Sequence, residues 1–271
     1  MKSFLIRTAS GILFVAVLLG AMLYNYISFG VLFAIAAGLA VNEFCNIVHS
    51  YKKTTFSTLL TVFGGVYLFF ILFAISFMNI GKPMILVAPY IFLMLYMFVR
   101  ELYRKEGSAL DNFAYFVLSQ VYAALPFALL NILASYSGEY SYVLPLSVFV
   151  FLWCNDSGAY CVGCLIGKHK MFERISPKKT WEGFAGGATV AIIAGYVMSQ
   201  FSDVLNTWQW MLTAAVVVAA GTYGDLIESC MKREMKIKDS GNFLPGHGGI
   251  LDRLDSCLLA VPAVVILLLL I

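Results

Sequence analysis

Long apolar stretches alternate with short polar segments along the whole chain. A helix needs about 20 mostly apolar residues to cross the hydrocarbon core of a bilayer. Nine stretches approach that length: 9–25, 29–48, 56–78, 83–99, 113–135, 141–160, 183–201, 208–224 and 256–271. The pattern therefore predicts an all-α polytopic membrane protein with about nine transmembrane helices.

The composition supports this prediction and excludes other classes of protein. Apolar residues make up 61% of the 271 residues and charged residues 12%, whereas a soluble domain has about 45–50% and about 25%. A soluble enzyme is excluded by this excess of hydrocarbon, and a disordered chain by the 15% of aromatic residues. Six cysteines, four of them in apolar stretches, do not indicate a secreted disulfide scaffold.

The positive charges indicate an orientation. With nine spans, 17 of the 18 Lys and Arg residues fall on the side of the N-terminus, and Lys82 alone falls on the other. Short loops rich in Lys and Arg stay in the cytoplasm. We therefore expect a cytoplasmic N-terminus and an outward C-terminus. The compact length without targeting features suggests a multi-pass protein of the bacterial inner membrane.

We expect one continuous membrane domain, since the chain has no internal repeat and no linker. Residues 1–140 would supply the N-terminal transmembrane helices, and 141–271 the C-terminal ones with the functional cytoplasmic loops. Two long loops dense in charge and glycine stand out, at about 154–182 and 225–255. Functional residues concentrate in such loops.

The second loop begins with a predicted helix that has one polar face. Asp225, Ser229, Lys232 and Arg233 recur at i, i+4, i+7 and i+8. A carboxylate, a hydroxyl and two cations on one face suit a phosphate with its metal. The alternative is a solvated helix end, where Lys and Arg are favoured by the helix dipole.

Glycines and acids follow that helix. Four glycines in nine residues, from Gly241 to Gly249, form a loop whose N–H groups could approach an anion, although most glycine-rich loops are simply turns. Asp252 and Asp255 then share a helical face, which suits Mg²⁺. The alternative is a surface pairing of Asp252 with Arg253.

The combined spacing resembles the signature of the phosphatidate cytidylyltransferase (CDP-diacylglycerol synthase) family. The matching positions are Ser229–Arg233, Lys238–Asp239, Pro245–Gly249 and Asp252–Asp255. Three further blocks resemble the family: Asn155–Tyr160, Ser176–Gly183 and Gly224–Ser229. The similarity covers about 150–260.

The resemblance implies that CTP and phosphatidate react at the cytoplasmic membrane interface, in phospholipid biosynthesis, to give CDP-diacylglycerol and pyrophosphate. The attacking phosphate monoester is largely dianionic near neutral pH, because its second pKa is about 6, and needs no general base. Catalysis would rest on positioning and charge stabilisation with Mg²⁺; a second cation is left open. The resemblance also suggests a homodimer in the lipid bilayer, with no nucleic-acid partner.

Within this reaction the residues fall into three groups. The catalytic candidates are Asp225, Ser229, Lys232, Arg233, Lys238, Asp239, His247, Asp252, Arg253 and Asp255. The substrate-binding candidates are Asn155, Asp156, Ser176, Lys178, Lys179, Gly248 and Gly249. Asp225 and Asp252 are the expected metal ligands.

The main alternative function is a transporter or channel with an intramembrane carboxylate site at Asp156 and Asp225. Charges concentrated on one side and the absence of a repeat argue against it. Cys161 and Cys164 have the spacing of half a zinc site, but small-residue helix packing is favoured there. Asn42 and Glu43 lie near the end of the second apolar stretch, where we expect a structural hydrogen bond or, second, a contact to incoming substrate.

Overall fold

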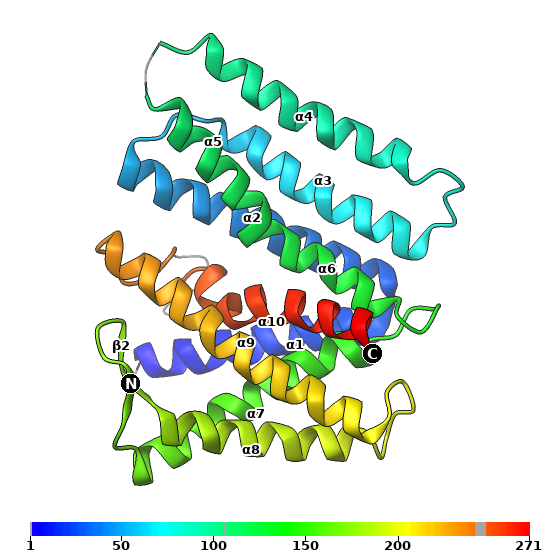
Figure 1. Cartoon of the computed structure of the whole chain (residues 1–271), viewed down its shortest axis with the longest axis vertical. Coiled ribbons are helices and arrows are strands. Elements are labelled where there is room, and N and C mark those ends of the chain that lie inside the picture. The colour runs from blue at the N-terminus through cyan, green and yellow to red at the C-terminus, as the bar shows by residue number, and fades with distance from the viewer. Residues whose placement is uncertain (1, 106, 242–247) are drawn as a thin grey trace. The chain divides into compact units, whose positions relative to one another are not determined.

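The computed structural model describes residues 2–105, 107–241 and 248–271, and these residues are mostly helical (Figure 1). The helices are α1 (Lys2–Tyr24), α2 (Tyr26–Lys52), α3 (Thr58–Phe77), α4 (Met84–Leu102), α5 (Ala109–Leu118), the π-helical turn η1 (Ser119–Ala124), α6 (Leu125–Ala134), α7 (Val143–Ile166), α8 (Trp181–Met198), α9 (Thr207–Glu234) and α10 (Leu251–Leu270). Two short strands, β1 (Lys170–Phe172) and β2 (Ser176–Thr180), form an antiparallel hairpin.

Seven helices of the described chain are long and apolar enough to cross a membrane, with α5, η1 and α6 counted as one. The prediction of an all-α polytopic membrane protein is confirmed at this level. The nine predicted spans include two that are not among the seven. In α1 the described apolar stretch is the short segment Ser10–Tyr24, and α8 has only 18 residues, of which Glu182 and four glycines lower its apolar content. The count of nine and the orientation of the termini stay predictions.

The first two helices are separated by a single residue. Asn25 accepts a hydrogen bond from the Ser28 N–H (2.8 Å), and Ser28 Oγ accepts one from the Asn25 N–H (3.2 Å). This reciprocal capping box satisfies N–H groups that have no partner within the helix. The boundary between α1 and α2 therefore follows from local sequence.

The chain forms two compact units. One comprises Met1–Tyr140 with Asp239–Arg253, and the other Ser141–Lys238 with Leu254–Ile271. We call them unit 1 and unit 2 and describe each by itself.

In unit 1, helix α2 packs against α3, and α3 also contacts α4 and α6 (Figure 1). Phe29 and Phe33 of α2 are fully buried, together with Phe116 of α5 and Leu130 of α6. The turn η1 interrupts the α5–α6 helix, and Gln120 within it donates to the Thr61 carbonyl of α3 (3.0 Å). A π-helical turn closes its hydrogen bonds over five residues instead of four and so contains an extra residue.

In unit 2, the helices α7, α8 and α9 pack against one another, and glycines bring α7 and α8 very close. A Cβ atom built on Gly158 would lie 3.0 Å from Gly187 Cα, and one on Gly183 would lie 3.0 Å from the Ala159 carbonyl oxygen. Such contacts are typical of helices that pack through small residues in a membrane.

The two cysteines with zinc-like spacing lie in this same part of α7. Both Cys161 and Cys164 are free and exposed, while Gly163 between them faces Gly183 of α8. The preference for small-residue packing at this position is confirmed.

One predicted loop boundary is wrong. The predicted span 141–160 overlaps the predicted loop that starts at about 154, and in the structure the helix α7 continues to Ile166. Its polar residues and glycine look like a loop in the sequence, but Gly158 is used for helix contact rather than for a turn. The true connection to α8 is shorter and contains the β1–β2 hairpin.

Candidate active site

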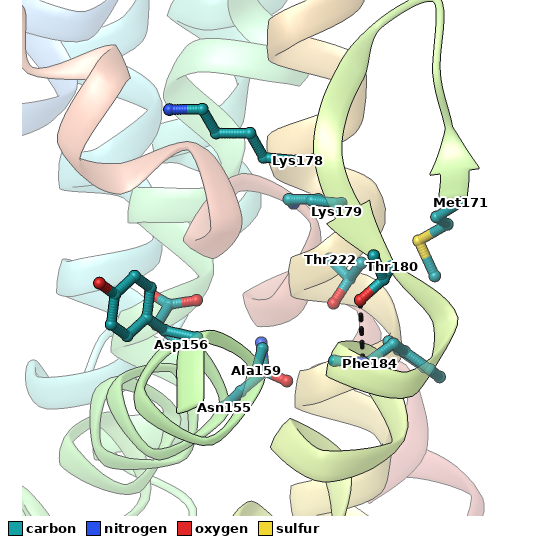
Figure 2. Close-up of a pocket in the computed structure, with 11 residues that line it drawn as sticks. Asn155, Asp156, Ala159, Met171, Lys178, Lys179, Thr180, Phe184 and Thr222 are labelled. Carbon is teal, nitrogen blue, oxygen red and sulfur yellow. Dashed lines mark hydrogen bonds between the residues drawn. The ribbon is translucent and has the colours of Figure 1, made fainter. Parts of the chain in front are cut away.

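Unit 2 contains a pocket of about 210 Å³ formed by α7, the hairpin, α8 and α9 (Figure 2). Its lining residues are Asn155, Asp156, Ala159, Tyr160, Met171, Lys178, Lys179, Thr180, Gly183, Phe184 and Thr222. Four of the seven expected substrate-binding residues are among them. The family-like blocks 155–160 and 176–183 therefore meet around one cavity, together with Thr222 of α9.

The floor of the pocket in the view of Figure 2 is formed by Asn155 and Asp156 of α7. Asn155 is 6% exposed, and its Oδ1 atom has no hydrogen-bond partner. A Cβ atom on Gly187 would collide with that oxygen, so only glycine at 187 allows α8 to pack here. The Asp156 side chain is exposed and interacts electrostatically with Asp225 and Lys179.

The hairpin is tied to α9 by an ion pair beside the pocket. Lys179 Nζ lies 2.6 Å from Asp225 Oδ2, and Ser229 Oγ donates to Asp225 Oδ1 over 3.1 Å. Because α9 extends to Glu234, the predicted helix through Asp225 and Ser229 is confirmed. The carboxylate of Asp225 thus has a cation on one side and a hydroxyl on the other.

A second ion pair lies farther along α9. Lys232 Nζ is 2.5 Å from Glu228 Oε2, and Glu228 is only 3% exposed. Sequence reasoning did not select Glu228, although its i, i+4 spacing to Lys232 was a usable signal. The Asp255 carboxylate interacts electrostatically with Asp225, Lys232 and Lys179. Acidic and basic groups therefore gather around this part of α9 in unit 2.

In unit 1, Asp252 organises the described ends of the glycine-rich stretch. Its Oδ2 atom accepts hydrogen bonds from the Ser240 N–H (2.7 Å), the Ser240 hydroxyl (2.9 Å) and the Gly249 N–H (2.9 Å). Gly248 has φ +86°, a backbone conformation that favours glycine. The Gly249 N–H, a candidate donor to phosphate, therefore donates to a carboxylate of the protein itself.

Glu43 of α2 meets the same segment. Its carboxylate accepts from the N–H groups of Ile250 (2.9 Å) and Leu251 (3.0 Å). The expected structural hydrogen bond at Glu43 is confirmed.

The remaining candidates are placed as follows. The side chains of Arg233, Lys238, Asp239 and Arg253 are exposed, and Ser176 is half-buried at the start of β2. His247 lies outside the described residues. Asp225 and Asp252, the expected metal ligands, belong to different units, so their pairing stays a prediction.

The carboxylates next to Asp225 suit a hard cation. Mg²⁺ prefers oxygen ligands and commonly takes one or two carboxylates, with substrate phosphates and water completing its coordination. Asp225, Asp156 and Asp255 provide such oxygens within unit 2. Within the described residues no three acidic, histidine or cysteine side chains are grouped so that they could hold a metal ion, and the Mg²⁺ site stays a prediction.

The hairpin is fixed to α8 by Glu182, which precedes the expected span 183–201. Its carboxylate lies 2.5 Å from His169 Nδ1 and accepts from the N–H groups of Lys168 and His169 (both 3.1 Å). The hydrogen bond from His169, with those from the backbone, lowers the pKa of Glu182 from 4.5 to about 2.

This shift predicts how acid affects the hairpin. The ionised Glu182 stabilises the fold fully above pH 4.5, and this contribution is lost as the pH falls toward 2. We expect Glu182→Gln to lower the melting temperature in detergent at pH 7, with the difference from wild type shrinking below pH 4. Glu173→Gln, at an exposed position of the same hairpin, is the control. An equal difference at both pH values would contradict the assignment.

Comparison with known proteins adds a separate finding. A family model described as "Cytidylyltransferase family" matches residues 5–271. The chain is similar to proteins named phosphatidate cytidylyltransferase: 48% identical over 124 residues in Staphylococcus epidermidis (strain ATCC 12228 / FDA PCI 1200), 41% over 165 residues in Staphylococcus haemolyticus (strain JCSC1435) and 45% over 124 residues in Staphylococcus aureus (strain COL). These alignments cover 45%, 60% and 45% of this chain, and 48%, 62% and 48% of the respective relatives. The chain therefore matches about half to three fifths of the length of these relatives.

Proposed function

This chain belongs to the cytidylyltransferase family, and we propose that it transfers the cytidylyl group of CTP to phosphatidate, forming CDP-diacylglycerol and pyrophosphate. The observation that carries the proposal is the pocket of unit 2. Its lining residue Lys179, from the hairpin, forms an ion pair with Asp225 of α9. Both residues lie in blocks that resemble the phosphatidate cytidylyltransferases. The names of the similar staphylococcal proteins support the same substrates.

The chemistry requires two anions to approach each other. An oxygen of the phosphatidate phosphate attacks the α-phosphorus of CTP, the new P–O bond forms, and the bond to the β-phosphate oxygen breaks as pyrophosphate leaves. Since the attacking oxygen already carries negative charge, the protein needs cations and hydrogen-bond donors rather than a base. Lys178 and Lys179 supply positive charge at the pocket, and Lys232 supplies it along α9.

A divalent cation completes this proposal. Mg²⁺ bound at Asp225 would neutralise the triphosphate and stabilise the departing pyrophosphate. Asp156 and Asp255 are the carboxylates that interact with Asp225 in unit 2. The proposed second ligand is Asp252, as expected from the sequence.

We place the site at the cytoplasmic face of the inner membrane, because basic residues concentrate in the loops that carry it. Phosphatidate would reach it from the bilayer, and a homodimer is the proposed assembly. Nine spans would put the N-terminus in the cytoplasm and the C-terminus outside.

A direct assay tests the function. Purified protein in detergent, given radiolabelled CTP, phosphatidate and Mg²⁺, should form a labelled lipid and release pyrophosphate in equal amounts. Chelation of Mg²⁺ by EDTA should stop the reaction, and added Mg²⁺ should restore it. If the protein is folded and the lipid still carries no label after long incubation, the proposal is overturned. Diacylglycerol in place of phosphatidate is the control, since it lacks the attacking phosphate.

A further inference from the structure

One buried acid in unit 1 has no role in the proposed chemistry. Glu43 lies in the second half of α2 and is 9% exposed. A buried carboxylate is costly unless hydrogen bonds compensate for the lost hydration. Its partners therefore indicate why an acid is present among the buried residues of α2, which are otherwise apolar.

Those partners lie at both ends of the glycine-rich stretch. Before the stretch, the Ser240 hydroxyl lies 3.3 Å from Glu43 Oε2. After it, the N–H groups of Ile250 and Leu251 donate to Oε1 and Oε2 over 2.9 and 3.0 Å. One side chain of α2 thus joins two segments that are separated by the residues 242–247.

The contact also completes the start of α10. Helix α10 begins at Leu251, and the first N–H groups of a helix have no acceptor within it. Ile250, just before the helix, cannot accept a hydrogen bond with its side chain. Glu43 supplies the missing acceptor from 207 and 208 residues earlier in the chain. The positive end of the helix dipole favours the negative charge at this position.

Steric contacts show that the fit is tight. A Cβ atom on Gly241 would lie 2.7 Å from Glu43 Oε1, and one on Gly249 would collide with Glu43 Oε2 and Ser240 Oγ. The Glu43 carboxylate therefore lies against backbone at both ends of the stretch. Two of its glycines are explained by the close approach of this acid.

We infer that Glu43 is a positioning residue that fixes the ends of the glycine-rich stretch and thereby orients Asp252 and Gly249. Ser240 links the two acids, since its hydroxyl and N–H also contact Asp252 Oδ2. The inference rests on the proposed function, in which Asp252 takes part in catalysis. It gives α2 a role in the reaction, although α2 lies outside the motifs between about 150 and 260 that resemble the family in the sequence.

The first test is Glu43→Gln, which keeps the size of the side chain. An amide has one acceptor oxygen, and its NH₂ group would face an N–H donor. Because small displacements of catalytic groups are costly, we expect kcat to fall by about 10- to 100-fold. The Mg²⁺ concentration for half-maximal rate should rise, and Glu43→Asp, which keeps the charge and both oxygens, should recover part of the activity.

Glu101→Gln is the matched control. Glu101 is another buried acid of unit 1 (7% exposed), but it pairs with Arg104 and accepts from Asn112. The variant Glu101→Gln should lower the melting temperature without changing the Mg²⁺ concentration for half-maximal rate. Ser240→Ala provides a milder variant that removes only the hydroxyl link, and it should shift the Mg²⁺ requirement in the same direction as Glu43→Gln.

Hydrogen exchange gives a readout independent of activity. Glu43→Gln should speed amide exchange in the peptide 248–254, and Glu101→Gln should not. The inference would be overturned if Glu43→Gln left both the amide exchange of the peptide 248–254 unchanged and the rate within twofold of wild type. Equal losses of rate in Glu43→Gln and Glu101→Gln would also overturn it. If the wild-type protein makes no CDP-lipid, the proposed function fails, and the exchange data alone decide whether Glu43 orders this segment.

Discussion

Replacing Asp225 by Asn is expected to lower the rate of CDP-lipid formation by about 100- to 1,000-fold. The carboxylate contacts Lys179 at 2.6 Å and Ser229 at 3.1 Å, and it is the proposed Mg²⁺ ligand in unit 2. An amide of the same shape keeps one acceptor but loses the charge that both the cation and Lys179 require. The measurement is incorporation of radiolabelled CTP into lipid at saturating Mg²⁺.

The control for this variant is Asp203→Asn, an exposed acid between α8 and α9, which should keep full activity. Melting temperatures of both variants separate loss of fold from loss of chemistry. A purely structural role for Asp225 as the partner of Lys179 makes a different prediction. In that case the loss of rate in Asp225→Asn would follow its loss of melting temperature, and the Mg²⁺ concentration for half-maximal rate would stay unchanged. An unchanged Mg²⁺ requirement would refute the proposed role of Asp225.

Gly249→Ala is expected to be strongly damaging in unit 1. Its Cβ atom would overlap the Glu43 carboxylate and the Ser240 hydroxyl, so the segment must move. Overpacking of this kind costs about 1–3 kcal/mol of stability, and displacement of Asp252 should reduce activity by a further 10-fold or more, on the order of the effect of a misplaced catalytic group. Thermal unfolding and the lipid-labelling assay measure the two effects separately.

A matched glycine shows whether the clash is the cause. Gly81 has open space around its Cα, so Gly81→Ala should be neutral in both measurements. Combining Gly249→Ala with Glu43→Asp shortens the opposing side chain, and the double variant should be less impaired than the sum of its single variants. Strict additivity would contradict the steric explanation.

Local periodicity accounts for the parts of the site that could be predicted. Asp225 and Ser229 meet because residues four apart share a helical face, and α9 continues far enough to include both. The apolar stretches predicted most helix positions for the same reason, since each depends only on neighbouring residues. The hairpin between α7 and α8 was not predicted, because its strands are only three and five residues long and contain no alternation of apolar and polar residues.

Long-range contacts explain what the sequence could not provide. The partners of Glu43 lie about 200 residues away, and no periodicity connects them. The usable signal was the presence of an acid in an apolar helix, which indicates a partner without identifying it. Likewise, the glycines at 241 and 249 suggested an approach by an anion, and in unit 1 the approaching anion is the Glu43 carboxylate.

The π-helical turn η1 makes the length of its helix as important as its composition. Each residue of an α-helix advances the chain by about 100° around the axis, since a turn has 3.6 residues. Because η1 already contains one extra residue, deleting one residue from Ser119–Ala124 would let the turn close as ordinary α-helix with little rotation of α6. Deleting one residue from the regular turns of α5 would instead rotate α6 by that amount relative to the start of α5, and would turn the buried Phe127 and Leu130 away from their neighbours. Deletions should therefore be tolerated more readily in η1 than in the regular turns beside it.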